Sequence, residues 1–311
     1  MALSETYERQ VALLIAVMPF VAAEKDFALK GGTAINLFLR DLPRLSVDID
    51  LTYLPVADRA QSLAAIDSAM KRLGKTIAVG MHGARVTEVV NRAEKIVTKL
   101  TVQTRDAQIK IEVTPVLRGC VFPAEERSVT AETEARFGYA QTRLVSFADL
   151  YAGKIVAALD RQHPRDLFDA AQLLAHEGIT DDLRAAFIVY LISHDRPIAE
   201  VVAPRRKEIS AEYLENFEGM TAEPVSADDL ITAREKLIAE ISGRMPAKHK
   251  EFLLGFKRGD PDWTLLGVPD AADLPAVRWK QINLDKLIPE QRATLVERLA
   301  AALERAGAPG P

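Results

Sequence analysis

Two glycines near the N-terminus have the type and position to bind phosphate. Gly31 and Gly32 directly precede a helix-like stretch at 33–39. A glycine turn at the start of a helix binds phosphate, because its free backbone N–H groups and the helix dipole both favour an anion. The pattern therefore predicts a phosphate site at this turn.

Two aspartates follow in a strand-like stretch at 44–53, where Asp48 and Asp50 alternate with apolar residues. Alternation along a strand points both carboxylates to one face, and such a pair binds a hard divalent cation such as Mg²⁺. Taken alone, the pattern is also typical of a solvated strand edge. The glycine turn upstream favours the metal site.

A third acid, Glu112, lies in an apolar strand at 108–116 between Ile111 and Val113. The two apolar neighbours are expected to face the core, which leaves Glu112 on the other face. With Asp48 and Asp50 on a separate strand, Glu112 completes a predicted cluster of three carboxylates, which can hold two metal ions.

The elements that must position these residues indicate an α+β protein. Strands are predicted at 27–29, 44–53, 84–90, 95–104 and 108–116, and a helix at 57–73. From Phe147 onward amphipathic helices dominate. We predict them at 147–159, 165–176, 181–193, 207–217, 227–242, 247–256 and 289–304.

Composition excludes several classes of protein. The 311 residues are 48% hydrophobic and 27% charged, which is ordinary for a globular protein with a sizeable core. A single cysteine, Cys120, excludes an internal disulfide and fits a reducing compartment. No apolar run is long enough to span a bilayer, so we expect a soluble cytoplasmic protein. The net charge of −4 confines any binding of nucleic acid to local basic clusters.

The order of these motifs resembles the DNA polymerase β nucleotidyltransferase superfamily, and more narrowly the AbiEii/AbiGii-type nucleotidyltransferase toxins of bacterial toxin–antitoxin pairs. The narrower resemblance is carried by residues 29–34, residues 44–50, Lys154 with Arg161 and residues 165–169, and residues 274–280. It implies an N-terminal polymerase-β-like nucleotidyltransferase domain with a mixed sheet at 1–146. A mainly α-helical domain that binds substrate or partner would follow at 147–311.

The resemblance also implies roles for individual residues. Gly31, Gly32 and Thr33 (or Ser46) would contact the triphosphate, and Lys30 and Arg44 flank these motifs as further candidates. Metal ligation falls on Asp48, Asp50 and Glu112, with Glu112 also taking the proton of the attacking hydroxyl, although an Asp is commoner there. Lys154 would reach the phosphates, and Asp166 would orient Lys154 or the incoming substrate.

Several of these residues also fit ordinary structural roles without catalysis. Lys154, on a helix with apolar neighbours, is without the resemblance most often a solvated side chain. Asp166 and Asp169 are also typical of a helix-start ion pair. We expect Val277 and Trp279, within the last motif, to pack in the core.

The resemblance implies a toxin that transfers NMP from an NTP with Mg²⁺ or Mn²⁺, with tRNA 3′ ends as the acceptor, so that translation stops. It also implies a cognate antitoxin. A phosphate on Ser46 would repel NTP and could serve the antitoxin. Three alternatives stay open: transfer to a protein, transfer to a small molecule such as an antibiotic, and a kinase-like or nucleotide-binding toxin.

Overall fold

The computed structural model describes residues 5–307, which form two compact units. The first unit ends at Ser146 and also contains Met220–Glu223, and the second contains Phe147–Gly219 and resumes at Pro224. Across the described residues, none of the helices combines the length and apolar character that a membrane span requires.

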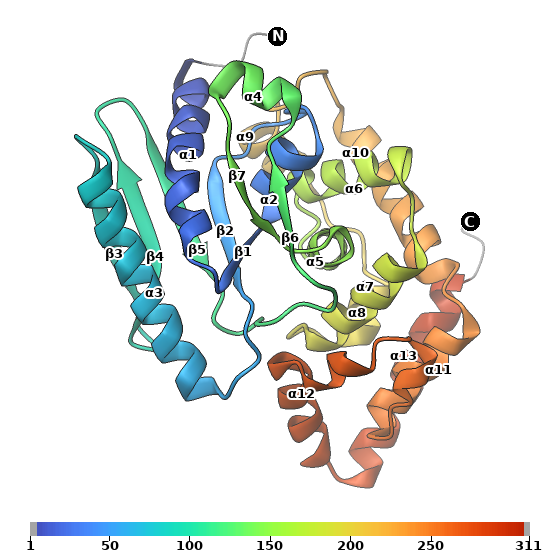
Figure 1. Ribbon diagram of the computed structural model, residues 1–311. Helices are drawn as coiled ribbons and strands as arrows, with labels where there is room; N and C mark the ends of the chain where they lie inside the picture. The colour runs from blue at the N-terminus through green and yellow to red at the C-terminus, as the bar shows by residue number, and fades with distance from the viewer. Residues whose placement is uncertain (1–4, 308–311) are drawn as a thin grey trace. The chain divides into compact units, whose positions relative to one another are not determined.

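The first unit contains a seven-stranded mixed sheet (Figure 1). Its strands are β1 (Phe27–Lys30), β2 (Asp48–Tyr53), β3 (Arg85–Asn91), β4 (Ile96–Gln103), β5 (Gln108–Val113), β6 (Glu125–Ser128) and β7 (Gln141–Leu144). Their order across the sheet is β3-β4-β5-β2-β1-β7-β6. The β2–β5 and β1–β7 pairs are parallel and the remaining neighbours are antiparallel. The predicted α+β class with a mixed sheet is confirmed.

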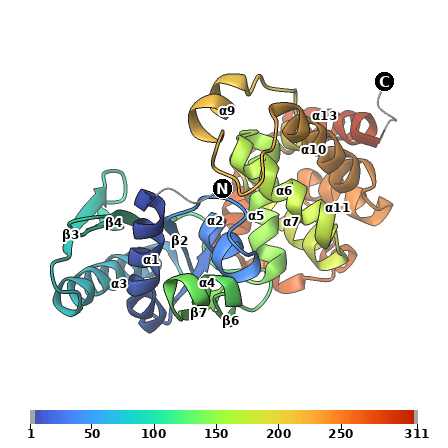
Figure 2. The same cartoon turned by 90° about the horizontal axis from the view of Figure 1, so that it is seen from above.

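Two long helices, α1 (Glu5–Ala23) and α3 (Arg59–Gly80), pack on the sheet (Figure 2). A third helix, α4 (Ala131–Phe137), precedes β7. Ile49, Leu100 and Ile111 lie in register on β2, β4 and β5 and are fully buried. Leu100 contacts α3, since a Cβ on Gly74 would lie 3.4 Å from its side chain. Each such buried side chain contributes about 1.5–3 kcal/mol, and their burial fixes which face of each strand is left open.

The segment before β2 differs from the prediction. One strand was expected over 44–53, but β2 begins at Asp48. Residues 43–45 instead pair with the returning segment 220–222, through Leu45 N to Met220 O at 2.9 Å and Ala222 N to Pro43 O at 3.0 Å. Ser46, which the predicted strand over 44–53 included, therefore precedes the strand.

The helix predicted at 33–39 begins two residues earlier. Gly31–Ala34 form α2, which continues as a π-helical segment, Ile35–Leu39. The two glycines are thus the first turn of the helix. The sequence also gave no signal for β6, because its four residues are all exposed and none of them is apolar.

The second unit is helical, as expected. Its α-helices are α5 (Phe147–Asp160), α6 (Pro164–His176), α7 (Asp181–Ser193), α8 (Ile198–Val202), α9 (Ser210–Asn216), α10 (Ala227–Ile238), α11 (Ala247–Arg258), α12 (Pro275–Asp285) and α13 (Pro289–Gly307). Shorter segments are the π-helical Ala239–Gly243 and the 3₁₀ turns Trp263–Leu265 and Pro269–Asp273. Helices α5 and α7 approach closely at Gly153, where a Cβ would lie 3.4 Å from Tyr190.

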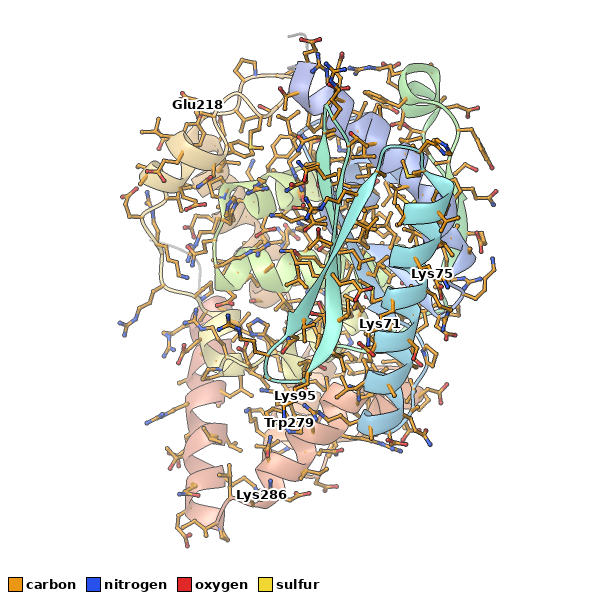
Figure 3. All side chains as sticks on the ribbon, turned by 90° about the vertical axis from the view of Figure 1, so that its left-hand side faces the viewer. Lys71, Lys75, Lys95, Glu218, Trp279 and Lys286 are labelled. Atoms are coloured by element: carbon orange, nitrogen blue, oxygen red, sulfur yellow. The ribbon has the colours of Figure 1, made fainter. Side chains whose placement is uncertain are left out.

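Helix α12 was not predicted, and it corrects one expectation about the core. Val277 is fully buried, but the Trp279 side chain is 58% exposed and projects from the helix (Figure 3). Lys280 lies 5.5 Å from the centre of the Trp279 ring, at the distance of a cation–π contact. Trp279 is therefore a surface residue.

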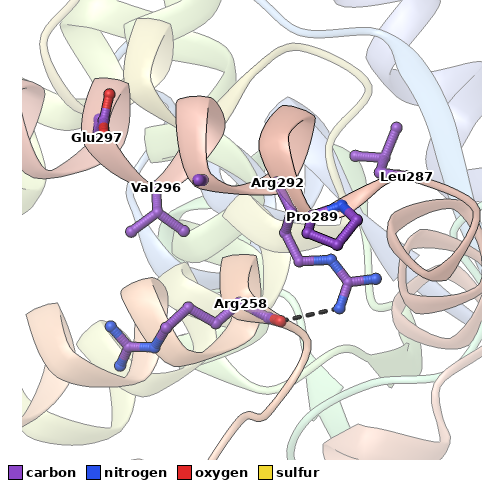
Figure 4. A pocket seen from close by; sticks show the side chains of 7 residues that line it. Arg258, Leu287, Pro289, Arg292, Val296 and Glu297 are labelled. Atoms are coloured by element: carbon purple, nitrogen blue, oxygen red, sulfur yellow. Dashed lines mark hydrogen bonds between the residues drawn. The ribbon is translucent and has the colours of Figure 1, made fainter.

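A groove of about 630 Å³ lies where α11 ends and α13 begins (Figure 4). Arg292 of α13 lines it and donates to Arg258 O at 2.9 Å and to Leu284 O at 2.8 Å. Both carbonyls lie in the last turns of their helices, where carbonyls lack partners inside the helix; Leu284 O also accepts from Leu287 N at 3.0 Å. One guanidinium thus joins the ends of two helices to a third.

Replacing Arg292 by Ala should lower the free energy of unfolding by about 2 kcal/mol, because two charged hydrogen bonds to helix ends are lost. Urea denaturation followed by circular dichroism measures this. The control is Arg298→Ala on an exposed position of the same helix, which should change stability by less than about 0.5 kcal/mol. Equal losses of stability in both variants would contradict the role of Arg292 in joining the three helices.

Candidate active site

Gly31 lies against Asp50, and this contact accounts for the first glycine. Its φ of +78° belongs to the left-handed region, and a Cβ there would lie 2.5 Å from Asp50 Oδ2. Any other residue would be strained and would also displace the carboxylate. The first helical turn therefore contacts a predicted metal ligand directly.

Gly32 allows a second close approach. A Cβ there would lie 2.6 Å from Ser46 Oγ and 2.7 Å from a terminal nitrogen of Arg44. Arg44 is only 3% exposed, and its guanidinium donates to Leu45 O at 2.9 Å. Asn36 supports the arrangement, since it donates to Gly32 O and accepts from Arg44 N. A hydroxyl and a cation thus lie directly beside the glycine turn.

Thr33 joins the turn to β2. Its hydroxyl donates to Asp48 O at 2.6 Å and lies 3.3 Å from Ser46 Oγ. Ser46 is also fixed from the other side, because its backbone N–H donates to the Tyr7 hydroxyl at 3.1 Å. Burial raises the pKa of Tyr7 and keeps that hydroxyl neutral. The predicted phosphate residues Gly31, Gly32, Thr33, Arg44 and Ser46 are therefore brought together.

The carboxylates lie on the sheet face opposite the buried Ile49 and Ile111, as predicted. Asp50 pairs in register with Glu112 on β5, and Asp48 pairs with Lys110. Residues in register on neighbouring strands have Cβ atoms about 5 Å apart on the same face. Asp50 and Glu112 are therefore side-chain neighbours, and Asp48 lies two residues further along β2.

A row of four charged residues crosses the sheet at this level. Asp50 pairs with Lys30 on β1, and Glu112 pairs with Lys99 on β4, so the order is Lys30, Asp50, Glu112, Lys99. Lys99 Nζ lies 2.6 Å from Glu112 Oε1. Lys99 was not predicted as a site residue, and only the strand pairing reveals it.

The predicted three-carboxylate cluster is not assembled. In the part of the chain that the structure describes, no group of three or more Asp, Glu, His or Cys side chains could hold a metal ion. Glu112 instead makes an ion pair with Lys99 of β4, on the side of β5 away from β2.

Lys30 lies at the end of β1, where its ammonium is 3.5 Å from Thr114 Oγ1. Burial lowers the pKa of Lys30, and the neighbouring Asp50 opposes that shift. Its amine is thus buried close enough to Asp50, one of the predicted metal ligands, to feel its charge.

Lys154 and Asp166 belong to the second unit and form a cluster of their own. Lys154 Nζ lies 2.9 Å from Asp166 Oδ1 and 3.0 Å from Asp169 Oδ2. The Lys154 side chain is 9% exposed and both aspartates are 1% exposed. The solvated alternative for Lys154 is therefore wrong, and Asp169 joins the cluster as a residue whose role sequence reasoning did not assign.

Arg161 completes this cluster from the surface, donating to both oxygens of Asp166. Burial alone raises the pKa of the Asp166 carboxyl, but Lys154 and Arg161 more than offset it, so that the pKa lies below its usual 3.8. Asp166 is thus a buried anion held in place by two cations, and it lies in the first turn of α6, as the helix-start alternative has it.

The loop before α6 positions Asp166. His163 caps the helix by accepting from Arg165 N at 3.1 Å, and Pro164 begins it. Gln162 precedes them with a φ of +54° and 1% exposure. It accepts from Arg234 Nε at 2.8 Å and donates to Arg205 O at 2.8 Å. The strained backbone is thus fixed by buried hydrogen bonds.

Comparison with known proteins decides the family. The family described as "Nucleotidyl transferase AbiEii toxin, Type IV TA system" matches residues 12–281. The chain belongs to this family. It is accordingly a nucleotidyltransferase toxin of a type IV toxin–antitoxin system, with an NTP substrate and a cognate antitoxin.

Among solved structures, MenT4, a nucleotidyltransferase toxin from Mycobacterium tuberculosis, is similar with a TM-score of 0.57. The two chains are 16% identical, and the match covers 95% of this chain and 94% of MenT4. At that identity the likeness concerns the fold. No curated protein matches the sequence significantly.

Gly31→Ala should destabilise this AbiEii-family toxin by about 2 kcal/mol more than Gly83→Ala, as measured by urea denaturation. Both glycines have a φ of +78°, but nothing lies within 4 Å of a Cβ on Gly83. The strain of a left-handed alanine is therefore common to both variants, and the difference reports the contact with Asp50. Equal destabilisation would show that Asp50 moves aside freely.

Asp166→Asn should lower the free energy of unfolding by about 3 kcal/mol at pH 7, because it breaks a buried ion pair. The folded-state pKa of Asp166 is depressed. The stabilisation is therefore present above pH 4 and is lost as the pH falls through the folded-state value. The gap between wild type and variant should narrow on acidification.

Urea denaturation at pH 7, 5, 4 and 3 measures this gap. Asp270→Asn, at an exposed position of the same unit, is the control and should show no such dependence on pH. A gap for Asp166→Asn that is constant over this range would contradict the assignment.

Proposed function

We propose that this enzyme transfers NMP from an NTP to the 3′ end of tRNA in a Mg²⁺-dependent reaction, and so blocks translation. The observation that carries the proposal is the contact of the glycine turn with Asp50, which is itself in register with Glu112. A phosphate site and a carboxylate pair are then parts of one site. That combination suits nucleotidyl transfer, which depends on positioning and charge neutralisation.

The residues present fit a divalent metal. Asp48, Asp50 and Glu112 supply carboxylate oxygens, the donors that Mg²⁺ and Mn²⁺ prefer, and they share one sheet face. Asp48 and Asp50 would hold the ion, with Glu112 joining them once it leaves Lys99. The bound ion supplies neutralisation of the triphosphate charge and of the oxygens that gain charge during transfer.

In our assignment the glycine turn binds the triphosphate. The N-cap residue of α2, Lys30, makes no side-chain hydrogen bond to the first turn, and the start of a helix favours phosphate oxygens. Arg44 and Ser46, beside Gly32, add a charge and a hydroxyl. Thr33 holds the turn against β2 and acts by positioning it.

The reaction has a defined balance of atoms. The acceptor hydroxyl attacks the α-phosphorus of the NTP, and a new P–O bond forms. The bond from that phosphorus to the β-phosphate oxygen breaks, and pyrophosphate leaves with the electron pair. Glu112 takes the proton of the hydroxyl. Lys154, oriented by Asp166 and Asp169, is assigned to the phosphates.

A basic loop in the second unit supports an RNA acceptor. Arg205, Arg206 and Lys207 are consecutive and exposed, which suits contacts with a phosphate backbone. The loop is anchored to the turn before α6, because Lys207 N donates to Gln162 Oε1 at 3.0 Å and Arg234 donates to Pro204 O at 2.6 Å. The cations are thereby presented on a fixed backbone.

The test is incubation of the purified protein with total tRNA, Mg²⁺ and each of the four α-³²P-labelled NTPs. Label should appear on tRNA, and Asp48→Asn should reduce the rate by at least about a hundredfold. Asp106→Asn, in an exposed turn of the same unit, is the matched control and should keep full activity.

Each alternative acceptor has its own outcome in this assay. Label on protein, or on an added aminoglycoside, would replace tRNA as the acceptor. Transfer from γ-labelled but not α-labelled ATP would identify a kinase-like toxin. Equal activity of Asp48→Asn and wild type would overturn the proposed site.

A further inference from the structure

We propose that Lys99 is a placeholder cation: it holds Glu112 while no metal is bound, and a divalent metal displaces it. The inference rests on the proposed metal site and adds a residue outside the glycine and aspartate motifs. Lys99 thereby sets the affinity for metal.

The strand pairing places Lys99 for this role. β5 lies between β2 and β4, so Glu112 has Asp50 as its neighbour on one side and Lys99 on the other. The Glu112 side chain takes the second direction, with Oε1 2.6 Å from Lys99 Nζ. The Glu112 carboxylate can therefore either pair with Lys99 or share a cation with Asp50, and the two interactions compete.

Charge explains why Glu112 turns to Lys99 when no metal is bound. Two carboxylates that are neighbours in register repel each other, and a cation on the far side of Glu112 relieves that repulsion. Two lysines, Lys30 and Lys99, flank the two carboxylates, so the row is formally neutral. A divalent ion held by Asp48, Asp50 and Glu112 would take over the neutralisation, and Lys99 would be released.

The ion pair is weak enough to be exchanged. The side chains of Lys99 and Glu112 are 32% and 43% exposed, and partly exposed pairs contribute little to stability. Once released from Glu112, the Lys99 ammonium can be hydrated by solvent. A deeply buried pair such as Lys154 with Asp166 could not act in this way, because breaking it leaves an uncompensated charge in the interior.

The chain offers a matched control in Lys110. It lies on β5, in register with Asp48, and is exposed on the same sheet face two residues before Glu112. Lys110→Met removes the same charge from the same face but leaves the Lys99–Glu112 pair intact. A general electrostatic effect on metal affinity would therefore appear in both variants, and a displaced ion pair only in Lys99→Met.

The experiment measures Mn²⁺ binding to the full-length, nucleotide-free protein by electron paramagnetic resonance at about 0.15 M salt, where long-range charge effects are screened. Lys99→Met should bind Mn²⁺ about two- to fivefold more tightly than wild type, the range that follows from loss of a partly exposed ion pair. Lys99→Gln should behave likewise, while Lys99→Arg and Lys110→Met should stay near wild type.

A double-mutant cycle completes the test. In a Glu112→Gln background, Lys99→Met should no longer change Mn²⁺ affinity, because the carboxylate for which the two cations compete is gone. An unchanged or weaker affinity in Lys99→Met, or an equal gain in Lys110→Met, would overturn the role of Lys99 alone. Mn²⁺ binding that Asp48→Asn does not reduce would overturn the metal site, and the role of Lys99 with it.

Discussion

The parallel pairing of β2 with β5 is the constraint on which the rest of the site depends. It is fixed by apolar burial on the opposite face, where Ile49 and Ile111 lie in register under the covering helices. Because side chains alternate along a strand, a slip of one residue would send the carboxylates into the core and the isoleucines into water. The register that builds the core therefore also makes Asp50 and Glu112 neighbours.

The glycine turn is joined to this sheet by contacts that leave no room for side chains. The absence of a Cβ lets Asp50 approach Gly31, and lets Ser46 and Arg44 approach Gly32. Thr33 then secures the turn through its bond to Asp48 O. These short contacts connect the start of a helix to two carboxylates on a neighbouring strand. The Gly-Gly-Thr motif is therefore explained by the lack of space for side chains as well as by affinity for phosphate.

In the second unit the lysine and the aspartates of the charged cluster are buried rather than exposed. Lys154 is buried, and a buried ammonium is costly unless it is paired. Asp166 and Asp169, one helical turn apart on α6, supply the pairing. In the sheet row, by contrast, the ion pair is half-exposed and exchangeable. The same types of residue thus form a fixed support in one unit and a displaceable contact in the other, and the difference is burial.

The sequence by itself determined the fold class, the apolar alternation that puts the acids on one face, and the family to which the motifs point. These are local properties of period, turn chemistry and motif order. Only the tertiary structure decided that Glu112 pairs with Lys99, that Lys154 is buried, that Ser46 precedes its strand and that Trp279 is exposed. The first three depend on which side chains meet across packed elements: β4 against β5, α5 against α6, and residues 220–222 against 43–45. Local periodicity carries no information about such contacts, because strand register and helix packing decide which side chains meet, even between elements that are neighbours in the chain.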